Sequence, residues 1–331
     1  MAIRPLPVLL LVLALPAAAC TAEGRAASSP ASPGAGPPAP AGVVSEKEAQ
    51  TVLDQWENAR AAAVRNGGTD WSPAEAGMAA EITTAQSKVN KMIGESVGGT
   101  REPIVKPRFA IPAKVSGEPW FMADFARNGS STRYQGIYRK TPAGWRLVAM
   151  SVTAGESRPP AVARDRNGLA TAVAADDGDG LIASPRRIAQ AHARVAGTLG
   201  EDRDVRRLFA TDSHARRDAD ALRDQRAQLA RGRWTTTVRA EVAPEIYALR
   251  TAGGALVWYG LRTRQTFTAR PGSTQTLGFK EAETAALSHG KRFTREAVHT
   301  SAALYLAVVP RSPGLVRVPT AWHTEVAVTG S

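Results

Sequence analysis

The side chains that most often carry chemistry are few in this chain, and they are not spaced for a shared site. All five histidines lie in the C-terminal half, at His192, His214, His289, His299 and His323. No two of them have the HxxxH spacing that brings two imidazoles to one metal ion. The sequence therefore predicts no metal site and no cofactor.

An acidic, glycine-rich run at residues 176–180 has the composition of a calcium-binding loop but lacks its ligands. Counted from Asp177, two positions that should supply oxygen ligands hold Leu181 and Ile188. We therefore interpret the run as part of a linker, residues 157–183. The chain also contains no GxSxG nucleophile motif and no glycine-rich phosphate loop.

The single cysteine, Cys20, directly follows three alanines at the end of an uncharged apolar stretch, residues 6–19. With Arg4 before it, this stretch has the length of a signal-peptide core and is too short to span a membrane. The cysteine has no disulfide partner, and its context is similar to the lipid-attachment site of bacterial lipoproteins. The pattern predicts a signal peptide, residues 1–19, and a diacylglyceryl, palmitate-bearing Cys20 that anchors the chain on the extracellular face of the cell membrane. Ordinary secretion and an uncleaved anchor are the alternatives.

Composition and charge divide the remaining chain. Residues 20–42 are rich in Pro, Ala, Ser and Gly, which predicts a disordered tether. Residues 43–156 carry 14 basic and 12 acidic side chains, whereas residues 157–331 carry 26 and 17. The basic surplus of the second half favours an anionic wall polymer or lipid as partner, with GC-driven arginine usage as the plainer explanation. The arginines of 203–233 alternate with aspartates, which suits a solvated helix and argues against nucleic acid.

Three landmarks recur at an offset of 138 or 139 residues, which indicates a duplication. They are a helix-capping serine (Ser45 and Ser184), a helix-ending glycine (Gly94 and Gly232) and a tryptophan in a strand-like segment (Trp120 and Trp258). We therefore predict two domains, residues 43–156 and 184–331, joined by the linker.

Each predicted domain has helices followed by strands, which places the chain in the α+β class. In the first domain the predicted strands are 104–115, 118–127, 131–140 and 145–152, with a hairpin turn at Asn128-Gly129. In the second domain they are 234–243, 245–251, 255–270, 292–309 and 315–328, with an irregular insertion of about 20 residues after 270.

The pattern from Tyr134 to Val148, YQGIYRKTPAGWRLV, resembles the closing hairpin of the nuclear-transport-factor-two-like (SnoaL, ketosteroid-isomerase-like) fold. The order of elements resembles that of actinobacterial lipoproteins of uncharacterised function with tandem domains of this kind. The resemblance implies two tandem cone-shaped domains, each with helices packed on a curved antiparallel sheet.

In enzymes of that superfamily an acidic base and a hydroxyl donor lie inside the cone, which makes Asp124 and Tyr134 the candidates here. Strand alternation leaves two alternatives open. Asp124 either lines the cone as a desolvated base, or it is solvated beside Arg127 or Arg133. Because the second domain has Gly260 and Arg262 near the corresponding place, we expect Asp124 to be non-catalytic.

The function predicted from the sequence is a non-catalytic binding or assembly module at the cell envelope, with an envelope protein or an anionic polymer as partner. One alternative is a ketosteroid-isomerase- or dehydratase-like enzyme that uses Asp124. A second alternative is a binder of anionic wall polymer or lipid through the basic second domain. Trp71 and Trp322 are candidates to line a pocket or interface. The core-forming tryptophans are expected to be Trp56, Trp120, Trp145 and Trp258.

Overall fold

The computed structural model describes residues 42–98, 102–155 and 158–331. Cys20, the predicted signal peptide and the predicted tether up to residue 41 lie outside these residues. The elements are α1 (Glu46–Arg65), α2 (Gly77–Ile93), β1 (Ile104–Ala110), β2 (Trp120–Arg127), β3 (Arg133–Thr141), β4 (Gly144–Thr153), α3 (Pro185–Gly197), α4 (Arg203–Arg206), α5 (His214–Arg231), β5 (Trp234–Thr251), β6 (Gly254–Ala269), α6 (Ala282–Leu287), β7 (Glu296–Pro310) and β8 (Arg317–Gly330). Within the described part of the chain, no helix has the length and apolar character needed to cross a membrane.

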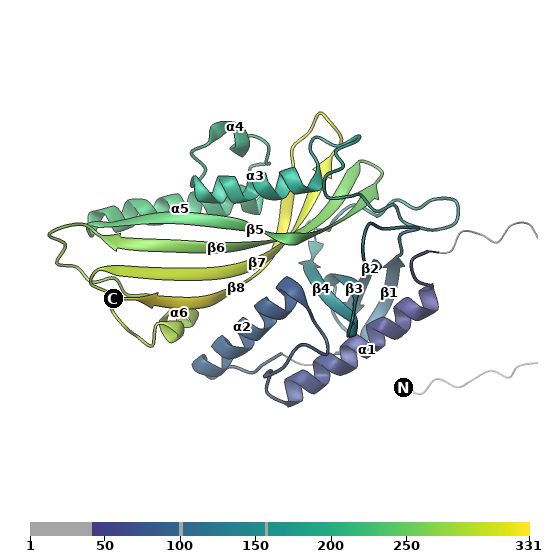
Figure 1. Cartoon of the computed structure of the whole chain (residues 1–331), viewed down its shortest axis with the longest axis horizontal. Coiled ribbons are helices and arrows are strands. Elements are labelled where there is room, and N and C mark those ends of the chain that lie inside the picture. The colour runs from purple at the N-terminus through teal and green to yellow at the C-terminus, as the bar shows by residue number, and fades with distance from the viewer. Residues whose placement is uncertain (1–41, 99–101, 156–157) are drawn as a thin grey trace, which may run out of the picture. The chain divides into compact units, whose positions relative to one another are not determined.

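The predicted α+β class is confirmed, and the two halves share one order of elements. In each half helices precede a four-stranded antiparallel meander, β1-β2-β3-β4 in the first and β5-β6-β7-β8 in the second (Figure 1). Ser45 caps α1 by accepting a hydrogen bond from Glu48 N (3.2 Å), and Ser184 caps α3 in the same way. Gly94 and Gly232 follow the ends of α2 and α5. The repeat landmarks thus occupy equivalent places.

Two details of the second half differ from the sequence expectation. The segments predicted as separate strands, 234–243 and 245–251, form the single strand β5. Its pairing with β6 shifts register between Val242 and Ile246, around Pro244. A proline cannot donate to the sheet ladder, so a bulge lets the strand continue past it. The insertion predicted as irregular contains the short helix α6.

Both faces of the first sheet are covered. On one face Phe125 and Tyr138 pack against Trp56 of α1, with ring centroids 5.9 and 5.8 Å apart. On the other face Trp120 packs against Tyr247 of β5 at 5.3 Å. Ser151 of β4 accepts a 3.1 Å hydrogen bond from the indole nitrogen of Trp258. The two tryptophans related by the repeat therefore both lie in the layer between the sheets.

This layer is part of a single hydrophobic cluster that draws buried side chains from both halves, whereas α3 and α5 cover the opposite face of the second sheet with a second cluster. The predicted linker is hydrogen-bonded to both halves. Ala170 N donates to Ile111 O (2.8 Å) and Val173 N donates to Ala248 O (2.9 Å). The halves are domain-like in topology but share a core, and the boundaries at residues 156 and 184 stay predictions.

Candidate functional site

The structure places Asp124 and Tyr134, the two candidates suggested by the family resemblance, on opposite faces of the first sheet. In the β2–β3 pairing Asp124 lies opposite Gln135, and Phe125 lies opposite Tyr134. Neighbouring residues of a strand point to opposite faces. Tyr134 stacks on Phe125 at 5.4 Å on the helix-facing side, while Asp124 faces the other way. The two side chains therefore do not form one site.

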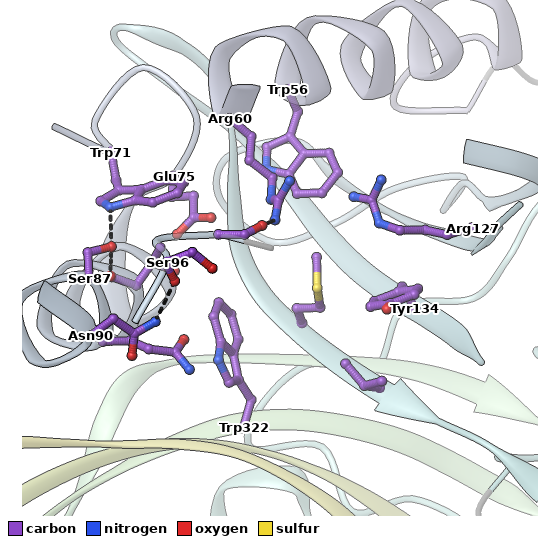
Figure 2. Close-up of a pocket in the computed structure, with 15 residues that line it drawn as sticks. Trp56, Arg60, Trp71, Glu75, Ser87, Asn90, Ser96, Arg127, Tyr134 and Trp322 are labelled. Carbon is purple, nitrogen blue, oxygen red and sulfur yellow. Dashed lines mark hydrogen bonds between the residues drawn. The ribbon is translucent and has the colours of Figure 1, made fainter. Parts of the chain in front are cut away.

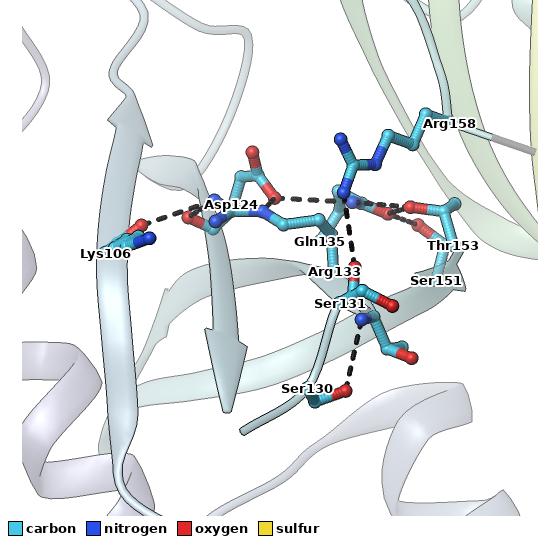
Figure 3. A network of polar contacts seen from close by, with 10 residues as sticks. Lys106, Asp124, Ser130, Ser131, Arg133, Gln135, Ser151, Thr153 and Arg158 are labelled. Carbon is cyan, nitrogen blue, oxygen red and sulfur yellow. Dashed lines mark hydrogen bonds and ion pairs between the residues drawn. The ribbon is translucent and has the colours of Figure 1, made fainter. Parts of the chain in front are cut away.

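Asp124 has the second environment that the sequence left open, beside Arg133. The Nε of Arg133 donates to Asp124 Oδ1 at 2.9 Å, and Nη2 donates to the backbone oxygen of Asp124 at 2.8 Å. Gln135 adds a longer contact of 3.3 Å. The contacts appear in Figure 3. Arg127, the other predicted partner, pairs instead with Glu57 through two hydrogen bonds of 3.0 and 3.1 Å. Asp124 is thus held as an ion-paired carboxylate.

On the helix-facing side of the same sheet lies a cavity of about 530 Å³, here called the aromatic pocket (Figure 2). Its aromatic lining consists of Trp56 from α1, Trp71 from the α1–α2 connection, Tyr134 from β3 and Trp322 from β8. Both tryptophans that the sequence marked as candidates, Trp71 and Trp322, line it. Trp56 was expected in the core, and it is buried while also forming part of this wall.

Glu75 supplies the aromatic pocket with a buried carboxyl group. Its segment is fixed to β4, because Leu147 N donates to Ala74 O (3.0 Å) and Ala76 N donates to Leu147 O (2.9 Å). Glu75 is only 4% exposed, and among the described residues its Oε2 has no hydrogen-bond partner. Burial raises its pKa to about 7, although Thr83 and Arg60 act in the opposite direction.

Two arginines also line the pocket, but other groups hold them. Arg60 donates a 2.6 Å hydrogen bond to Gly98 O, and burial lowers its pKa, with the charge of Arg127 acting in the same direction. Arg127 is paired with Glu57 and lies 5.8 Å from the centre of the Tyr134 ring.

The two indole nitrogens on this side of the pocket differ. Trp71 Nε1 donates to Ser87 Oγ at 3.0 Å, whereas Trp56 Nε1 has no partner within the described chain. Among the described residues, three buried side-chain atoms that line the pocket have no hydrogen-bond partner: Glu75 Oε2, Thr83 Oγ1 and Trp56 Nε1. Aromatic walls with a few unsatisfied polar groups can bind a small molecule that has an apolar body and its own hydrogen-bonding groups.

Sequence reasoning missed Glu75. The residue lies between two predicted helices in a segment without periodicity, and its burial depends on the docking of that segment against β4. The neighbouring Trp71 was the only signal that pointed to this region.

Three histidines of the second half make contacts with neighbouring side chains in the fold. His192 is buried and its Nδ1 lies 2.8 Å from the Tyr259 hydroxyl, and burial lowers the His192 pKa to about 4. His299 and His323 both contact Glu325. Across the described ranges, no group of three or more His, Cys, Asp or Glu side chains is arranged to hold a metal ion.

Comparison with known proteins gives one match. A family model described as a domain of unknown function (DUF8094) matches residues 40–329. No curated protein and no solved structure matches the chain. The matched region contains both sheets, the segment between them and every residue of the aromatic pocket.

Proposed function

This chain belongs to the family of the domain of unknown function DUF8094, and we propose that it binds a small, partly apolar ligand in the aromatic pocket without transforming it. The observation that carries the proposal is the buried Oε2 of Glu75, which lines an aromatic cavity and has no hydrogen-bond partner in the described part of the chain. Leaving a buried polar atom unpaired costs about 1–3 kcal/mol. A bound ligand that donates a hydrogen bond to this oxygen would remove the cost.

The pocket chemistry defines the class of ligand. Trp56, Trp71 and Trp322 offer flat apolar surfaces, which suit a cyclic or aromatic body. Glu75 accepts a hydrogen bond when ionised, so the ligand should carry an N–H or O–H donor. The unpartnered Nε1 of Trp56 can donate to an acceptor on the same molecule.

The location of the protein is part of the proposal. Lipid on Cys20 would hold the binding module on the extracellular face of the cell membrane, with residues 21–42 as a tether. The support is the alanine-cysteine junction after an uncharged apolar stretch. Replacing Cys20 by serine should move the protein from the membrane fraction to the medium. Equal membrane association of the two forms would contradict lipid anchoring.

We propose that the first half is cone-shaped, as the resemblance to the nuclear-transport-factor-two-like fold implies. A pocket enclosed between α1, α2 and one face of the first sheet supports this proposal.

A second candidate function is catalysis of proton transfer. Its support is Glu75, whose pKa near 7 suits a general acid or base at neutral pH. Asp124, the base in the sequence-based version of this hypothesis, is ion-paired and lies on the other face of the sheet. Conversion of a bound ligand that stops in the Glu75→Gln variant would favour catalysis over simple binding.

Binding can be tested with N-phenyl-1-naphthylamine, a neutral fluorescent probe that has an aromatic body and one N–H donor. We expect a saturable fluorescence increase with the purified chain. Trp322→Ala should weaken binding at least about tenfold, because it removes one wall of the pocket. Asp124→Asn is the matched control, since its side chain faces away from the pocket. Absence of saturable binding, or equal binding by the Trp322→Ala variant, would contradict the proposal.

A further inference from the structure

A second cavity, of about 460 Å³, lies on the face of the first sheet that carries Asp124. Strands β1, β2 and β3 form one side, and residues 158–164 of the linker form the other. Its basic lining side chains, here called the basic groove, are Lys106, Arg108, Arg133, Arg158 and Arg164. Asp124 is the single acidic side chain that lines it among the described residues.

Asp124 does not neutralise the groove, because it is already engaged by Arg133 at 2.9 Å. Among the described residues, no carboxylate forms an ion pair with the other four basic side chains. Two of those four are positioned by backbone oxygens. Arg158 donates to Ser131 O (3.3 Å), and Arg164 donates to Phe109 O (2.6 Å) and Gly168 O (2.8 Å). A carbonyl oxygen orients a guanidinium without cancelling its charge.

The arginines of the second half differ from those of the basic groove in their partners, although the second half carries the larger basic surplus. Many of them are paired with acidic side chains: Arg186–Asp176, Arg194–Asp202, Arg206–Asp220, Arg223–Asp220, Arg226–Glu201, Arg239–Glu241, Arg250–Asp177 and Arg317–Asp212. The sequence placed anion binding in that half. The ion pairs there, and the four basic side chains in one cavity here that have no ion-pair partner among the described residues, favour the basic groove instead.

The groove has a structured floor. Gln135 donates to Asp124 (3.3 Å) and to Thr153 (3.0 Å), and Ser151 donates to Gln135 Oε1 (3.0 Å). Gln135, Ser151 and Thr153 are buried, and Figure 3 shows this network beside Arg158. Because the floor is satisfied internally, Arg133 is held in place before any ligand arrives.

One edge of the groove is shaped by a strand irregularity. The β1–β2 pairing shifts register between Val105 and Arg108, and Lys106 has a positive φ of 51°. Positive φ is uncommon outside glycine. Bulges of this kind re-aim side chains, and here Lys106 and Arg108 both line the cavity. Apolar side chains complete the wall: Met122, Pro159, Pro160, Val162 and Leu256.

We propose that the basic groove binds a phosphate-type oxyanion that carries at least two negative charges and is attached to an apolar group. Arginine side chains match the planar, bidentate recognition of phosphate oxygens. Several unpaired cations around one cavity attract a multiply charged anion more strongly than a singly charged one. The apolar wall can receive the carbon skeleton of the ligand. Such chemistry is offered both by soluble organic phosphates and by phospholipids whose headgroup carries two phosphates, such as cardiolipin.

The experiment uses the full chain with Cys20→Ser, so that the lipid anchor does not contribute to binding. One arm titrates inorganic pyrophosphate by calorimetry. The other measures cosedimentation with vesicles of cardiolipin and phosphatidylcholine, compared with phosphatidylcholine alone. Binding to pyrophosphate assigns a soluble ligand, and binding only to the cardiolipin vesicles assigns a lipid headgroup. In either arm affinity should fall as salt rises from about 20 to about 200 mM.

The double variant Lys106→Gln/Arg108→Gln should weaken binding at least about tenfold. Its matched control, Arg217→Gln/Arg231→Gln, removes the same charge from exposed positions of α5 and should change binding less than about twofold. Equal weakening by both variants, or no binding in either arm, would overturn the proposal. Because Trp322→Ala should leave anion binding unchanged, failure here is distinguishable from failure of the aromatic pocket.

Discussion

On the helix-facing side of the first sheet, Glu75 is buried and its Oε2 has no partner among the described residues. On the opposite side, Asp124 is bound by Arg133 and Gln135 beside basic side chains that have no ion-pair partner within the described ranges. Burial raises the pKa of Glu75 to about 7. Asp124 instead forms an ion pair with Arg133 at 2.9 Å, so the two carboxyl groups have different surroundings.

The comparison shows how one strand pair can serve two sites. Tyr134 and Gln135 are neighbours in β3, yet Tyr134 lines the aromatic pocket and Gln135 lines the basic groove. Alternation along the strand produces this separation. Residues that a family resemblance groups together, such as Asp124 and Tyr134, can therefore belong to different cavities.

The largest expected effect on the free energy of unfolding comes from disrupting the packing between the two sheets, behind the face of the first sheet that carries the basic groove. Trp258 is fully buried and donates to Ser151 of the first sheet. Trp258→Ala should lower the free energy of unfolding by about 3–5 kcal/mol, because it leaves a cavity and removes the hydrogen bond that Ser151 accepts. Urea unfolding can be followed separately by circular dichroism and by fluorescence of a label in the first half.

Loss of structure in both halves at one urea concentration would show that the shared core is cooperative. Leu315→Ala is the control, since Leu315 is 54% exposed and the change should have little effect. If the first half unfolds at the wild-type urea concentration in the Trp258→Ala variant, the halves are independent and the predicted domain boundary at residue 156 gains support. Because the two halves share a hydrophobic cluster, we expect residues 43–156 expressed alone to be much less stable than the whole chain.

The second-largest expected effect is that of Glu75→Gln on the free energy of unfolding, and it depends on pH. Its pKa is raised to about 7 in the folded chain but is about 4.3 in an unfolded chain. The folded state therefore binds the proton more tightly. The contribution of Glu75 to the free energy of unfolding is therefore fully present below about pH 4 and is lost as pH rises through about 7. Glu75→Gln removes this loss and should stabilise the fold by about 3 kcal/mol at about pH 8, with little change at about pH 4.

Urea unfolding of the wild type and the variant at both pH values measures this difference. Subtracting the two free energies of unfolding at each pH cancels the contributions of all other titrating groups. A stability difference that does not depend on pH would mean that Glu75 stays ionised in the fold. It would also remove the main support for proton transfer in the aromatic pocket.

Local features of the fold could be predicted from the sequence, because their causes lie within a few residues. The serine caps and the four strands of the first half depend on near neighbours. For Asp124 the sequence offered Arg127 and Arg133 as possible partners in one of two open alternatives, and the structure pairs it with Arg133. The two sites depend on contacts between distant segments. Glu75 is buried in a segment that is hydrogen-bonded to Leu147 of β4, and the basic groove brings Arg164 of the linker and Lys106 of β1 to the same cavity. Composition correctly indicated a basic surplus in the second half but could not indicate that ion pairs offset much of it.

The smallest expected effect is that of Asp124→Asn, and its sign should be opposite to that of Glu75→Gln at about pH 8. Asparagine removes the charge that pairs with Arg133, while Arg133 keeps its hydrogen bond to the backbone oxygen at position 124. Because the side chains of Arg133 and Asp124 are 13% and 23% exposed, the pair is partly screened by solvent. We expect a destabilisation of about 1 kcal/mol near neutral pH. Asp176→Asn is the control, because Asp176 pairs with Arg186 but is 75% exposed, so its loss should be barely measurable. A clear stabilisation by Asp124→Asn would mean that Asp124 is a strained buried acid like Glu75, and the distinction between the two faces of the sheet would fail.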